Sequence, residues 1–117
     1  MAEDDPLVRM EAADMLGDAG FDVLEASTAP AALAHLETRS GVALLFTDVL
    51  MPGSFDGLAL AHEARRRWPE MPIVVVSGRV TPGPAQLPDR ARFLSKPYYA
   101  STLARVIREM GVGTSTN

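Results

Sequence analysis

An unbroken apolar run from Val42 to Thr47 leads directly to Asp48, and this feature limits the possible folds of the 117-residue chain more than any other. A strand that is buried on both faces carries apolar residues at successive positions, which is typical of a parallel sheet covered by helices on both sides. Open sheets of this kind bind their ligands beyond the carboxyl ends of the strands. Asp48 is therefore the first residue for which we expect a chemical role.

The size and charge of the chain restrict its class. With 117 residues, of which 47% are apolar, the chain can form one hydrophobic core. The net charge of -4 and the lack of a basic stripe argue against a nucleic-acid surface, and the lack of cysteine excludes disulfides and thiolate metal sites. No apolar stretch reaches the length of a membrane span, and the first residues are acidic, unlike those of a signal peptide. We expect a cytoplasmic domain over residues 1–110 that binds neither nucleic acid nor membrane, followed by a flexible tail over 111–117.

Capping residues and apolar spacing predict four helices. Asp5 and Pro6 are a capping residue and a first helical residue, and apolar residues then recur at helical spacing as far as Gly20. The other three helices are predicted from Ser27 and Thr28 to Glu37, from Gly57 to Arg67 behind Asp56, and from Ser101 to Met110.

Short β-rich runs alternate with these helices. They cover Phe21–Ala26, the run before Asp48, Ile73–Val76 and Arg92–Ser95. This alternation predicts an α/β sandwich with a parallel sheet and right-handed crossovers. Three prolines and a glycine in the seven positions from Pro82 to Pro88 interrupt the pattern, so we expect a loop between Ser77 and Phe93 in place of a helix.

Polar side chains follow several of the predicted strands. Asp48, Ser77 and Lys96 lie at carboxyl ends of strands, and Glu3 and Asp4 lie just before the first helix. Carboxylates that share one edge of a sheet repel one another unless a cation lies between them, and Mg²⁺ prefers oxygen ligands. A carboxylate nucleophile, a divalent cation, an ammonium group and a hydroxyl can together support phosphoryl transfer. These residues therefore predict a Mg²⁺-dependent phosphoryl-transfer site.

Four short segments in this order resemble the receiver domain of bacterial two-component response regulators. They are Glu3–Arg9, Thr47–Gly53, Val76–Gly78 and Leu94–Tyr98. The resemblance extends from Glu3 to about Met110. It implies a flavodoxin-like doubly wound parallel sheet with the strand order 2-1-3-4-5.

The resemblance also implies a phosphorylation site with bound Mg²⁺. Asp48 would accept a phosphoryl group from a histidine of a sensor kinase or a histidine phosphotransfer protein. Asp4 would bind Mg²⁺ directly and Glu3 through water, and Asp48 and the backbone carbonyl of Leu50 would complete the protein ligands.

Three residues would link phosphorylation of Asp48 to a change in the protein-interaction surface. Lys96 would pair with Asp48 and then with the phosphoryl oxygens. Ser77 would hydrogen-bond the phosphoryl group, and its movement would let the ring of Phe93 turn inward. The domain would then be a signalling phosphoacceptor and not an enzyme, with an unidentified downstream protein as its target, and a dimer would be compatible with this fold.

The chain departs from the receiver pattern at three places. Receivers have a first strand of about five apolar residues before the acidic pair, whereas here only Met1 and Ala2 precede Glu3. We therefore expect a truncated first strand, which means either a start placed too far downstream or a gap filled in another way, for example by a strand from another chain. The fourth helix is degenerate, and the loop at Gly53–Phe55 is one residue longer than usual. The last two departures are similar to receivers of hybrid sensor kinases and to stand-alone receivers.

Other functions are less well supported by the sequence. An aspartate-nucleophile phosphatase would need a second aspartate two residues after Asp48, where this chain has Leu50. A nucleotide-binding domain would need a glycine-rich loop after a strand, and His62 reads as an exposed helix residue and not as a kinase histidine. The alternative that stays open is a pseudo-receiver, a phosphorylation-independent protein-interaction module.

Overall fold

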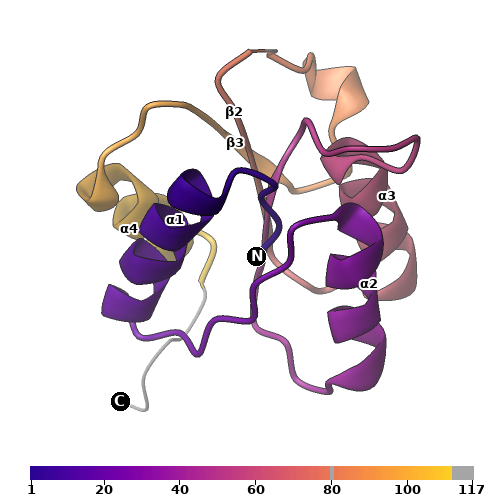
Figure 1. Ribbon diagram of the computed structural model, residues 1–117, viewed down its shortest axis with the longest axis horizontal. Helices are drawn as coiled ribbons and strands as arrows, with labels where there is room; N and C mark the ends of the chain where they lie inside the picture. Colours follow the sequence, from indigo (N-terminus) through magenta and orange to yellow (C-terminus); the bar gives the residue numbers. More distant parts are fainter. Residues whose placement is uncertain (80, 112–117) are drawn as a thin grey trace.

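The computed structural model describes residues 1–79 and 81–111, and the predicted tail lies outside the described residues from position 112 onward (Figure 1). Within these residues, four helices, three strands and one 3-10 turn follow one another. They are α1 (Pro6–Asp18), α2 (Ala29–Thr38), β1 (Leu45–Asp48), α3 (Gly57–Arg67), β2 (Ile73–Ser77), η1 (Pro84–Gln86), β3 (Arg92–Ser95) and α4 (Ala100–Glu109).

The three strands form a parallel sheet in the order β1-β2-β3, with Asp48 opposite Val76 and Ser77 opposite Ser95. Helices α1 and α4 cover one face of this sheet and α2 and α3 cover the other (Figure 1). Successive strand residues point to opposite faces, so Phe46 and Val74 enter the core under α1 and α4, whereas Ile73 and Val75 enter the core under α2 and α3. The predicted flavodoxin-like α/β class is confirmed.

Helices α1, α2 and α3 begin directly after their predicted caps, whereas α4 begins at Ala100, one residue before its predicted start. The Asp5 carboxylate accepts hydrogen bonds from Leu7 N at 2.9 Å and Val8 N at 3.3 Å, which confirms Asp5 as the cap of α1. Thr28 caps α2, and Asp56 caps α3 by accepting from Ala59 N at 2.9 Å. Helices α1 and α3 therefore begin close to Asp48, at the carboxyl edge of the sheet.

Met1–Glu3 occupy the centre of the fold, between β1 and the segment that ends at Ala26. Ala2 N donates to Phe46 O at 2.9 Å, Asp48 N donates to Ala2 O at 3.0 Å, and Glu3 N donates to Ala26 O at 3.0 Å. Ala2 therefore forms isolated parallel bridges on both sides. The expected first strand is thus reduced to one bridging residue. The three strands β1, β2 and β3 correspond to strands 3, 4 and 5 of the predicted order 2-1-3-4-5.

The prediction of a strand over Phe21–Ala26 is wrong, because only Ala26 forms a bridge. A strand needs a neighbour along its length, and the central segment is too short to pair with residues before Leu24. The strand before Asp48 also starts later than its apolar run, at Leu45, whose N–H donates to Pro72 O at 2.9 Å.

The loop predicted in place of a fourth helix is confirmed, since residues 81–91 contain only the short turn η1. Side chains of α3 hold this loop in place. His62 Nε2 donates to Gln86 O at 2.6 Å, and Arg65 Nε donates to Asp89 O at 2.8 Å. Across residues 1–79 and 81–111, no helix combines the length and apolar character needed to cross a membrane.

Candidate functional site

Asp48 is the last residue of β1, and its side chain lies at the carboxyl edge of the sheet. It is 8% exposed, and Thr47 Oγ1 donates to its backbone carbonyl at 2.9 Å. The backbone N–H groups of Asp48 and Val49 are bound to Ala2 O and Val76 O on the two neighbouring segments. The ladder on both sides thus fixes the position of this carboxylate.

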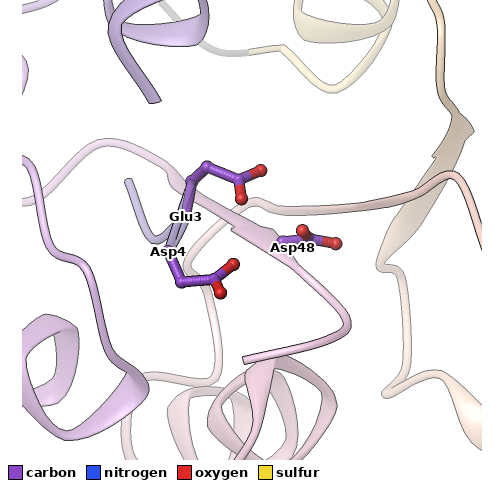
Figure 2. Close-up of side chains that lie close together, drawn as sticks. All are labelled: Glu3, Asp4 and Asp48. Carbon is purple, nitrogen blue, oxygen red and sulfur yellow. The ribbon is translucent and has the colours of Figure 1, made fainter. Parts of the chain in front are cut away.

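Glu3 and Asp4 lie next to Asp48 because the central segment runs parallel to β1 and leads into α1. Figure 2 shows the three carboxylates pointing to the same side, two from the N-terminal segment and one from β1. One oxygen from each of the three lies within 4.8 Å of the others. Glu3 is 4% exposed, whereas Asp4 is exposed to solvent. The structure therefore brings together the three acidic residues selected from the sequence.

Lys96 follows β3 directly and reaches two of these carboxylates. Its Nζ lies 2.6 Å from Glu3 Oε1 and 3.0 Å from Asp48 Oδ2, and its backbone N–H donates to Ser77 O at 3.0 Å. Burial raises the pKa of Glu3, and this effect exceeds the opposing hydrogen bonds from Lys96 and Asp5 N. Partial burial tends to lower the pKa of Lys96, but the bonds to Glu3 and Asp48 reverse the shift, so its pKa is raised.

The structure says less about the predicted roles of Ser77, Phe93 and Leu50 in the site. Ser77 ends β2, is 2% exposed and accepts a hydrogen bond from Arg79 N at 3.2 Å. Phe93 is partly buried and packs against the core under α2 and α3. Leu50 follows Asp48 by two residues with its side chain at the surface. The roles of Ser77 and Phe93 as switch residues and of the Leu50 carbonyl as a ligand stay predictions.

Two residues that were not selected from the sequence contact the backbone of the site, one at Glu3 and the other at the end of β1. Arg9 donates through a guanidinium nitrogen to the Glu3 carbonyl at 3.1 Å and pairs with Glu25 at 3.4 Å. Gly57 lies so close to β1 that a Cβ there would be 1.5 Å from the Asp48 carbonyl oxygen. An arginine on a helix and a glycine after a cap are both common, so the sequence alone does not indicate these roles.

The donor set fits a hard divalent cation. All three side-chain donors are carboxylates, and one ammonium group does not balance three negative charges. Mg²⁺ takes oxygen ligands and keeps several waters, so a pocket with one exposed carboxylate and two buried ones suits it. The same positive charge would attract an incoming phosphoryl group.

This sheet, with an acidic pocket and a lysine at its carboxyl edge, defines a signalling domain of the receiver class. The chain belongs to the response regulator receiver domain family, whose family model matches residues 1–108.

Two curated proteins are similar in sequence to this chain. The sensor kinase CckA of Brucella abortus is 35% identical over an alignment of 114 positions, which covers 94% of this chain and 12% of the kinase. The nitrogen assimilation regulatory protein NtrX of Azorhizobium caulinodans is 33% identical over an alignment of 118 positions, which covers 97% of this chain and 26% of that protein. The chain therefore spans a minor part of the length of these relatives.

Solved structures agree with this assignment. A response regulator receiver protein from Sinorhizobium medicae has a TM-score of 0.84 with 29% identity, covering 93% of this chain and 89% of that one. The receiver domain of NtrX from Brucella abortus has a TM-score of 0.78 with 30% identity, covering 93% of both chains.

Proposed function

We propose that Asp48 accepts a phosphoryl group, with Mg²⁺, from a phosphohistidine of a sensor histidine kinase or a histidine phosphotransfer protein. The observation that carries this proposal is the position of the Asp48 carboxylate, 3.0 Å from Lys96 Nζ and within 4.8 Å of the carboxylates of Glu3 and Asp4. A nucleophile, a fixed positive charge and a set of cation ligands are thereby combined at one strand end.

The transfer needs few steps. A carboxylate oxygen of Asp48 attacks phosphorus as the P–N bond of the phosphohistidine breaks, and the electron pair of that bond returns to the imidazole nitrogen. Glu3, Asp4, Asp48 and the Leu50 carbonyl would hold Mg²⁺, which supplies positive charge to the phosphoryl oxygens. Lys96 already contacts the Asp48 carboxylate, so after the transfer its ammonium group can pair with the oxygens of the new phosphoryl group.

The output of the switch would be a changed protein surface. In this proposal the Ser77 hydroxyl donates to a phosphoryl oxygen, and Phe93 follows by settling deeper into the core that it already contacts. The surface would then act on an unidentified target protein. The reaction belongs in the cytoplasm, where ATP is available to charge a histidine kinase.

A direct test is phosphorylation by acetyl phosphate with and without Mg²⁺, followed by mass spectrometry of the intact chain. We expect Mg²⁺-dependent modification of the wild-type chain and none in Asp48→Ala, with the far-ultraviolet circular dichroism spectrum unchanged. Asp22→Asn changes an exposed carboxylate elsewhere and should be modified normally. Equal uptake by Asp48→Ala would refute the assignment of this residue, and no uptake by the wild-type chain would favour the pseudo-receiver.

A further inference from the structure

The peptide bond between Glu3 and Asp4 joins two of the three carboxylates of the acidic pocket (Figure 2). Because this bond is planar, its orientation sets the direction in which both side chains leave the backbone. Glu3 N donates to Ala26 O at 3.0 Å, so a neighbouring segment holds the amide side of Glu3. Its carbonyl lies beyond the last backbone bridge, and no backbone N–H of the described residues donates to it. The plane of the Glu3–Asp4 peptide bond therefore depends on a side chain.

Arg9, near the start of α1, supplies that side chain. One of its guanidinium nitrogens donates to Glu3 O at 3.1 Å, and its Nε lies 3.4 Å from Glu25 Oε1. Only 22% of the Arg9 side chain is exposed. A planar guanidinium binds two acceptors in fixed directions, which a flexible ammonium group does less well. Arg9 thus connects α1, the Glu3 carbonyl and the residue before Ala26.

Arg9 contacts the acidic pocket through its backbone and not through its carboxylates. Within residues 1–79 and 81–111, its ion pair is with Glu25 alone. Lys96, in contrast, contacts the carboxylates of Glu3 and Asp48. A divalent cation has to compete with Lys96 for those oxygens, whereas Arg9 leaves them free. The two basic residues should therefore have opposite effects on cation binding.

We propose that Arg9 is a positioning residue for Mg²⁺, which fixes the Glu3–Asp4 peptide bond so that both carboxylates stay on the side of Asp48. This inference rests on the proposed function and adds to it a residue outside the set of ligands. Residues that orient metal ligands typically change metal affinity about 10–100-fold when they are replaced. In the described part of the chain, Arg9 forms no hydrogen bond or ion pair with Asp48 or Lys96. It should therefore act on Mg²⁺ affinity and not on phosphoryl transfer itself.

The sign of the change in Mg²⁺ affinity separates positioning from charge. Arg9→Met removes a positive charge, which by itself would strengthen the binding of a divalent cation. Loss of positioning has the opposite effect, so calorimetry of the complete 117-residue chain should show Mg²⁺ binding about tenfold weaker than in the wild type. Arg9→Lys keeps the charge but not the two directed contacts, so its Mg²⁺ binding should be roughly threefold weaker. Arg108→Met removes an exposed charge elsewhere and should bind Mg²⁺ normally.

Amide hydrogen exchange without Mg²⁺ tests the positioning directly. Asp5 N donates to Glu3 Oε2 at 3.2 Å, and this bond depends on the direction of the Glu3 side chain. We expect faster exchange at the Asp5 amide in Arg9→Met. The Asp48 amide, which is bound to Ala2 O, should exchange as in the wild type.

The Mg²⁺ dependence of phosphorylation by acetyl phosphate completes the test. In Arg9→Met, the half-saturating Mg²⁺ concentration should rise about tenfold, and the maximal rate at saturating Mg²⁺ should stay within about threefold of the wild type. Calorimetry needs no phosphodonor, so a wild-type chain that binds Mg²⁺ without taking up phosphate would refute the proposed function, and the affinities would still test Arg9.

Several results would overturn the role of Arg9. They are wild-type or tighter Mg²⁺ binding in Arg9→Met, a lower maximal rate with unchanged Mg²⁺ affinity, and no Mg²⁺ binding by the wild-type chain. If urea denaturation shows that Arg9→Met does not fold, the Mg²⁺ affinity of Arg9→Lys decides, and wild-type affinity in that variant would overturn the proposal.

Discussion

Lys96 Nζ lies 2.6 Å from Glu3 Oε1, although 93 positions separate the two residues in the chain. The same ammonium group contacts Asp48 at 3.0 Å, so it joins the central segment, β1 and the end of β3 at one point. Glu3 is almost fully buried, and a buried carboxylate requires a partner. Lys96 is therefore both a structural clamp for the N-terminal segment and the resident cation of the acidic pocket.

Replacing Lys96 with methionine should test its role as the resident cation of the pocket. Without the ammonium group, Mg²⁺ has no competing cation, so we expect tighter Mg²⁺ binding in calorimetry. Phosphoryl uptake from acetyl phosphate should fall roughly 100-fold, because no fixed ammonium group then stabilises the negative charge on the phosphoryl oxygens.

Arg108→Met serves as the control for Lys96→Met, since it removes one exposed positive charge far from the pocket. It should leave both Mg²⁺ binding and phosphoryl uptake unchanged. Wild-type uptake in Lys96→Met would show that this residue has no part in the transfer.

Gly57→Ala should unfold the end of β1, since a Cβ would lie 1.5 Å from Asp48 O and 2.8 Å from Thr47 Oγ1. Backbone atoms cannot move aside cheaply, so we expect a loss of about 3 kcal/mol in the free energy of unfolding measured with urea. Gly17→Ala is a matched control, because nothing lies within 4 Å of a Cβ there and alanine favours the interior of α1. It should stabilise the chain by about 0.5–1 kcal/mol, and similar effects of the two changes would contradict the clash.

Much of this fold could be predicted from local signals. Asp5, Thr28 and Asp56 act as helix caps because their short polar side chains reach N–H groups within the next three residues. The strands at Ile73–Ser77 and Arg92–Ser95 follow from short β-rich runs between turns. Such features depend on neighbouring residues, and so they can be read from one sequence.

The rest of the fold depends on contacts between distant residues. Phe21–Ala26 has the composition of a strand, but pairing needs a neighbour, and the central segment offers one only at Ala2. In the site, the residue types of Glu3, Asp4, Asp48 and Lys96 predicted a shared pocket. The support from Arg9 and the close approach of Gly57 could not be predicted, since each depends on the distance between elements.

Arg65→Ala should release the loop that stands in place of the fourth helix. The guanidinium donates to Asp89 O at 2.8 Å, to Pro69 O at 2.9 Å and to Met71 O at 2.6 Å, which joins α3 to both segments beyond it. Its loss should cost about 1–3 kcal/mol and speed amide hydrogen exchange in residues 86–91.

Arg66→Ala removes the neighbouring guanidinium, which pairs only with Glu63 at the surface among the described residues. We expect its free energy of unfolding to stay within about 0.5 kcal/mol of the wild type. Unchanged exchange in residues 86–91 of Arg65→Ala would mean that η1 and its flanks are held by other contacts.

Tyr98 should titrate late in an alkaline titration followed by tyrosinate absorbance. Burial raises its pKa from 10.0 to about 12, the charge of Lys96 opposes this shift, and the carboxylates of the acidic residues nearby add smaller increases. Its ring also packs edge-on against Phe46 at a centroid distance of 6.1 Å. The folded chain keeps this proton between pH 10 and 12 whereas the unfolded chain releases it, so stability should fall as the pH rises through this window.

Tyr98→Phe should remove the titration step near pH 12 and lessen that loss of stability, and Tyr99→Phe should retain both. A step near pH 12 that persists in Tyr98→Phe would show that Tyr98 is not the residue that titrates there.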